Sequence, residues 1–117
     1  MVKERVDVKK IADVTIASCK DMKLNDDLVI QEWGDQLLGL LDDVSCRKLL
    51  IDFSHVLFMS SSALRALITL NKKIKEAKAG LVLCAIDDNI MEAFRITRLD
   101  NVFTIKKDED EGIRSFQ

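Results

Sequence analysis

The sequence predicts one domain of the α/β class, close to the border with α+β. Its 117 residues are a common size for a single core, and residues 1–117 contain no proline and four glycines, so no linker divides them. Short apolar runs alternate with longer segments of helical period. From Lys48 onward the order is strand, helix, strand, helix, strand, which requires an at least partly parallel sheet joined by right-handed crossovers.

The N-terminal part predicts two short strands, over residues 6–8 and 14–18, and then a helix over residues 28–41. Asp26 and Asp27 stand where an acidic residue caps a helix start. Five apolar side chains of this helix recur at helical spacing, which predicts a buried face: Ile30, Trp33, Leu37, Leu40 and Leu41.

The rest of the chain continues the alternation. Residues 48–53 predict a buried strand, and a helix follows from Ser61 or Ser62 to Ala79, with Gly80 as the glycine that ends it. Residues 81–86 predict another buried strand. A helix over 90–97, a strand over 102–105 and a short helix over 108–116 complete the chain.

The composition argues against several classes of function. Eighteen basic against twenty acidic residues give a net charge of −2, without the basic excess that nucleic-acid binders show, so we expect no direct nucleic-acid contact. No apolar run approaches the roughly 20 residues of a membrane span, and the N-terminus does not read as an export signal. The cysteines, Cys19, Cys46 and Cys84, are scattered and predict reduced thiols. We therefore expect a cytoplasmic protein without a membrane partner.

Enzyme motifs are missing from the sequence. His55 is the single histidine, which rules out histidine-rich zinc sites, and neither a nucleophile elbow nor a glycine-rich phosphate loop occurs. The paired aspartates lie at predicted helix ends, where capping explains them. We expect His55 in a polar turn and Trp33 in the core. The sequence thus predicts no catalytic residue, no metal site and no cofactor.

One segment, residues 51–64, carries a candidate site. It reads I-D-F-S-H-V-L-F-M-S-S-S-A-L: a buried strand, a polar loop, a second apolar stretch, and three hydroxyls at a helix start. A helix cap accounts for one serine. A helix N-terminus also tolerates an added phosphate, because its free amides and partial positive charge favour an anion. Such a phosphate adds about −1.5 to −2 charges, enough to eject a bound partner.

The stretch over residues 49–64, L-L-I-D-F-S-H-V-L-F-M-S-S-S-A-L, resembles the signature of the STAS-domain anti-sigma-factor antagonists of bacteria, F-M-D-S-S-G-L at a helix start. Residues 81–85, L-V-L-C-A, are similar to the family's next strand, and residues 93–105 are similar to its "helix, then L-x-x-V-F-x-I" ending. The resemblance covers about residues 6–116. It implies a small mixed sheet of four to five strands, with about four helices mainly on one face.

The resemblance also implies a function, partner switching in transcription regulation. In the family, the unphosphorylated antagonist binds a protein that is both anti-sigma factor and serine kinase, phosphorylation releases it, and a PP2C-type phosphatase resets the switch. The register places Ser61 at the phosphoacceptor, with Ser60 and Ser62 as alternatives and Ser62 as cap or neighbour. The implied partner-binding surface consists of Asp52, Ser54, His55, Ser60, Ser61, Ser62 and Arg65.

This sequence departs from the family pattern at two positions. Ser60 stands where the family has Asp, and Ala63 where it has Gly. These changes keep two alternatives open: a STAS scaffold that does not switch, within a larger sensory complex, or a STAS domain that binds a small molecule or nucleotide. For the oligomeric state we expect a monomer or a weak homodimer.

Overall fold

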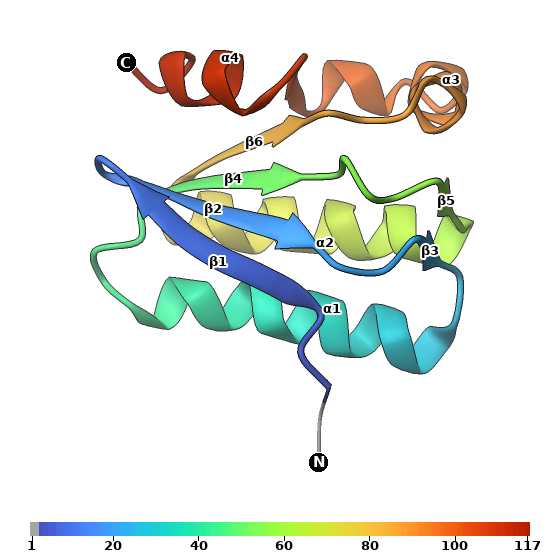
Figure 1. Cartoon of the computed structure of the whole chain (residues 1–117), viewed down its shortest axis with the longest axis horizontal. Coiled ribbons are helices and arrows are strands. Elements are labelled where there is room, and N and C mark those ends of the chain that lie inside the picture. The colour runs from blue at the N-terminus through green and yellow to red at the C-terminus, as the bar shows by residue number, and fades with distance from the viewer. Residues whose placement is uncertain (1–2) are drawn as a thin grey trace.

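The computed structural model describes residues 3–117. Figure 1 shows a central sheet with helices on both sides. The strands are β1 (Val6–Ile11), β2 (Val14–Cys19), β3 (Lys23–Leu24), β4 (Lys48–Asp52), β5 (Phe58–Met59), β6 (Gly80–Cys84) and β7 (Thr104–Lys106). The helices are α1 (Asp27–Gly39), α2 (Ser61–Glu76), α3 (Asp88–Ile96) and α4 (Glu109–Arg114), with 3₁₀ turns at Leu40–Asp42 and Leu99–Asn101.

The main sheet has five strands in the order β1-β2-β4-β6-β7. The hairpin pair β1 and β2 is antiparallel, whereas β2, β4, β6 and β7 run parallel to one another. β3 and β5 form a separate parallel pair of two residues each. The carboxyl ends of β2, β4 and β6 therefore point toward the end of the molecule that contains β3, β5 and the start of α2 (Figure 1). The mixed sheet and the four helices that the sequence predicts are confirmed.

Two apolar cores fill the two faces of the sheet. The larger is built around Trp33, Phe53 and Phe94 and takes in the buried faces of α1, α2 and α3. The smaller lies between the strands and α4, where Leu50 and Val82 meet Ile113 and Phe116. The helices thus lie mainly, but not all, on one face, because α4 covers the other.

One of the two helix ends predicted from the sequence is confirmed, and the other is wrong. Asp26 accepts hydrogen bonds from the amides of Leu28 and Val29, as expected for the first helix. Gly80, however, does not end the second helix. α2 ends at Glu76, and Lys78 adopts the left-handed conformation (φ 60°) that usually selects glycine. Gly80 instead begins β6, against Phe116, whose ring an added Cβ would approach to 3.2 Å.

Other predictions for single residues hold. Trp33 is 1% exposed, and its Nε1–H donates to the sulfur of Cys19 at 3.3 Å. All three cysteines are buried and free. Burial raises the pKa of the Cys19 and Cys84 thiols to about 12, which disfavours the thiolate form. Over residues 3–117, none of the helices is long and apolar enough to cross a membrane.

Candidate functional site: the N-terminus of helix α2

The three serines occupy three different positions at the start of α2. Ser60 is the N-cap, and its Oγ accepts a hydrogen bond from the Ala63 amide at 3.3 Å. Ser61 is the first helical residue and is exposed. The half-buried Ser62 accepts a hydrogen bond from the Arg65 guanidinium at 3.1 Å. The prediction of a serine cap is right, but the cap is Ser60 and not Ser62.

The position of this helix start is set by the small sheet of β3 and β5. The Ser60 amide donates to the Leu24 carbonyl at 2.9 Å, and the Leu57 amide donates to the Met22 carbonyl at 2.8 Å. Beneath this pair, Leu24, Val56 and Met59 are buried in the larger core. The serines therefore stand on a segment that is bonded to a distant part of the chain.

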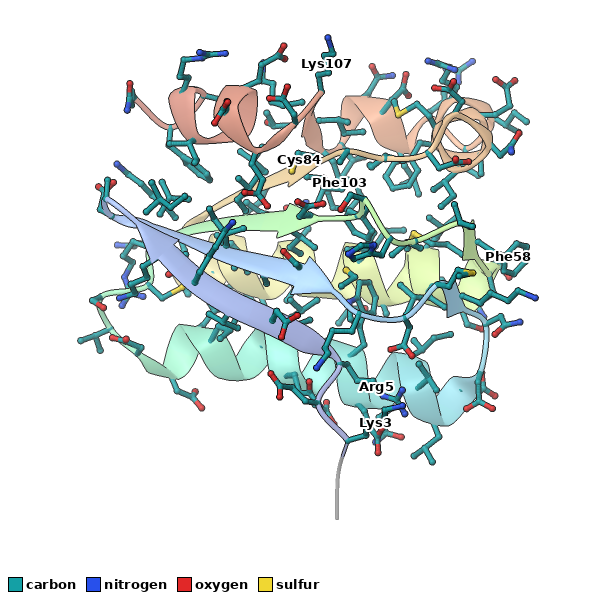
Figure 2. All side chains as sticks on the ribbon, viewed as in Figure 1. Lys3, Arg5, Phe58, Cys84, Phe103 and Lys107 are labelled. Atoms are coloured by element: carbon teal, nitrogen blue, oxygen red, sulfur yellow. The ribbon has the colours of Figure 1, made fainter. Side chains whose placement is uncertain are left out.

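Three large apolar side chains next to the serines are exposed. Met22 is 58% exposed, Leu57 54% and Phe58 49%. Phe58 projects from β5 at the same end of the molecule (Figure 2). We call Met22, Leu57 and Phe58 the apolar platform. The sequence predicted an apolar stretch over residues 56–59 but did not show which side chains face solvent, and Met22 had no sequence signal.

The electrostatics of α2 differ from those of the other helices. α1, α3 and α4 each have an aspartate cap and an acidic residue in the first turn, but α2 has neither. The α2 first turn thus leaves its partial positive charge uncompensated. Among the described residues, the amides of Ser61 and Ser62 have no hydrogen-bond partner. An anion on Ser61 would meet these free donors.

The other residues of the predicted partner-binding surface differ in their exposure to solvent. Ser54 and His55 are exposed in the loop after β4, and Arg65 is exposed one turn along α2. Asp52 is only 7% exposed, and its carboxylate accepts from the Ser54 amide at 2.7 Å. Burial alone would raise the pKa of Asp52, but hydrogen bonds with the Glu109 carboxyl and with Ser54 lower it. Asp52 therefore holds the start of the loop and presents little of itself to solvent.

The described residues, 3–117, include no group of three or more His, Cys, Asp or Glu side chains that could hold a metal ion. The site consists of hydroxyls, free amides and exposed apolar side chains.

Comparisons with known proteins show which family has this architecture. A family model of the STAS domain matches residues 11–112. BtrV of Bordetella bronchiseptica, a protein named for a proposed role as an anti-sigma factor antagonist, is 22% identical over 71 residues, which are 61% of this chain and 61% of BtrV. The alignment thus spans less than two thirds of that relative.

Solved structures show the same fold. An anti-sigma-factor antagonist (STAS) domain protein from Planctomyces limnophilus has a TM-score of 0.83 at 24% identity, over 96% of this chain and 97% of that one. The phosphorylated form of SpoIIAA, a cell fate determinant of Bacillus, has a TM-score of 0.70 at 12% identity, over 96% and 99% of the two chains. With the family model covering most of its length, this chain belongs to the STAS domain family.

Proposed function

We propose that this chain is an anti-sigma-factor antagonist that works by partner switching in the cytoplasm. Unphosphorylated, it binds an anti-sigma factor that is also a serine kinase, and phosphorylation of Ser61 releases that partner. A PP2C-type phosphatase resets it. The likeness to BtrV and to the STAS domain protein of Planctomyces limnophilus, which are named as antagonists, supports this assignment.

The observation that carries the proposal is that the three serine hydroxyls differ in their hydrogen bonds and exposure. Ser60 Oγ caps the helix and Ser62 Oγ is bound to Arg65, whereas the exposed Ser61 is committed to neither role. A kinase that reaches this surface therefore finds Ser61 as the available acceptor. SpoIIAA, whose fold matches this one, has been solved in a phosphorylated form.

The surroundings of Ser61 explain how one phosphate could release a partner without unfolding the domain. The uncompensated α2 N-terminus favours the phosphate by roughly 0.3–1 kcal/mol, so the helix stays intact. A partner that covers the apolar platform would have to bury the phosphate beside it. Burying apolar surface is favourable, whereas burying a phosphate whose charge the two free amides only partly offset costs free energy, so the partner dissociates.

The test uses the serine kinase of the histidine-kinase-like ATPase type encoded nearest to this gene, with ATP and Mg²⁺. Mass spectrometry should find one phosphate, which Ser61→Ala abolishes and which the matched variants Ser60→Ala and Ser62→Ala retain. Phosphate that persists in Ser61→Ala would refute the residue assignment.

Binding is measured separately. Ser61→Asp should weaken kinase binding at least tenfold, with Ser61→Asn as the uncharged control. Equal affinity of Ser61→Asp and Ser61→Asn would instead identify a scaffold that does not switch.

A further inference from the structure

The outer side of β1 is an unpaired sheet edge. β1 is the first strand in the sheet order, and it forms the front edge of the sheet in Figure 1. Its six residues pair with β2 on one side only, and no other described strand lies on the opposite side. A free edge of this length presents a row of backbone donors and acceptors to solvent.

The β1–β2 pairing shows which backbone groups are free. The Lys20 amide donates to the Arg5 carbonyl at 3.0 Å, so Arg5 and Lys20 form a hydrogen-bonded pair of the antiparallel ladder. Bonded and non-bonded pairs alternate in such a ladder. Asp7, Lys9 and Ile11 therefore bond to β2, and the amides and carbonyls of Val6, Val8 and Lys10 point outward.

The side chains of this edge are exposed from Asp7 to Ile11. Val8, in the middle, is 48% exposed although it is a large apolar residue in a strand. We propose that a second copy of this chain pairs with β1 in antiparallel orientation, joining two five-stranded sheets into one. This interface contains none of the residues of the α2 site and does not depend on the proposed function.

Symmetry and charge select the register. A twofold axis perpendicular to the sheet keeps each face of the sheet on the same side in both copies. Opposing residues must then lie on the same face, so the axis passes beside one residue of β1, which faces the same residue of the second copy. Centring on Asp7 opposes two aspartates, and centring on Lys9 opposes two lysines. Centring on Val8 opposes Val8 to Val8 and each Asp7 to Lys9 of the second copy. This register also aligns the outward groups of Val6, Val8 and Lys10 for hydrogen bonding.

The dimer is weak. Lys9 already pairs with Glu109 at 3.1 Å, and Asp7 lies 3.7 Å from Lys20, so the new pairs compete with existing ones. Exposed ion pairs contribute about 0–1 kcal/mol each. The alternating charges mainly exclude the other registers, and the six edge hydrogen bonds and the Val8 contact supply the attraction.

Sedimentation equilibrium over a wide concentration range tests the proposal. The unmodified chain should show a monomer–dimer equilibrium. Asp7→Lys and Lys9→Asp each oppose like charges and should weaken dimerisation at least tenfold. An equimolar mixture of the two variants restores both charge pairs, so native mass spectrometry should detect a dimer with one chain of each. Asp100→Lys and Lys72→Asp make the same charge changes at exposed sites elsewhere and should dimerise normally.

Val8→Pro gives a test independent of charge. The Val8 amide points outward, so proline removes a dimer hydrogen bond but no bond to β2. Thermal melts by circular dichroism should show the variant folded, and sedimentation should show a monomer. An unmodified chain that is monomeric at every concentration would overturn the proposal. So would a dimer that survives Val8→Pro, or a mixture of the two charge variants that stays monomeric.

Discussion

The contact between α4 and the sheet can be measured with a pair of glycine substitutions. Gly112 lies in α4 directly over Leu50, and a Cβ built on it would be 2.6 Å from Leu50 Cδ1 and 3.0 Å from Cδ2. Leu50 is fully buried, so its side chain has little space to withdraw. Overpacking of this kind costs about 1–3 kcal/mol. Gly34 lies within α1, and a Cβ there would meet nothing within 4 Å.

Replacing a glycine inside a helix by alanine stabilises the helix by about 1 kcal/mol, a term that both positions share. Gly34→Ala should therefore stabilise the protein by about 1 kcal/mol. Gly112→Ala should lie about 1–3 kcal/mol below it, because only there does the new methyl group overlap Leu50. Urea unfolding of both variants, with m-values compared, gives the difference. Equal stabilisation of the two variants would refute the close packing of α4 on Leu50.

Three further predictions concern buried or shared polar groups. Thr15→Val should stabilise the protein by about 1 kcal/mol in the same assay, because the buried Thr15 Oγ1 has no hydrogen-bond partner. A loss of stability would show that the hydroxyl is hydrogen-bonded. The hydrogen bond with Asp52, together with burial, raises the pKa of Glu109 above 4.5. The protonated Glu109 side chain therefore stabilises the fold at acid pH, and this stabilisation is lost as pH rises through the raised pKa. Glu109→Gln should gain stability relative to the unmodified protein between about pH 4 and pH 7, and a difference that stays constant with pH would contradict this. Cys19 and Cys84 should resist a thiol reagent at about pH 8 in the folded protein and react after unfolding in urea, whereas rapid labelling of the native chain would contradict their burial.

Sequence reasoning recovered the elements whose signal is local. The apolar period of α1 and the compact run of β4 specify a helix and a strand without reference to the rest of the chain, and the structure has both. The Asp26 cap was predictable because an acidic residue directly before a periodic segment has few other roles.

Features that depend on tertiary contacts were not recovered. The β3–β5 pair is two residues long, too short for a periodicity, and it exists because Met22 and Leu24 accept bonds from a segment more than thirty residues away. Gly80 looked like a helix end because glycine favours that position. The helix ends earlier, at Glu76, and Lys78 takes the left-handed conformation instead, while packing against Phe116 accounts for Gly80. For the candidate site, the sequence located the serines, but only the backbone geometry shows that Ser60 is the cap.

The cap at Ser60 has a consequence for the chemistry of the unfolded chain. In an extended peptide the three hydroxyls of Ser60, Ser61 and Ser62 are near-equivalent nucleophiles, and nothing in their order distinguishes them. Folding removes this equivalence, because Ser60 acquires the Ala63 amide and Ser62 acquires Arg65. Selective modification of Ser61 would therefore depend on the folded state, and it would report that the chain that received it had already folded.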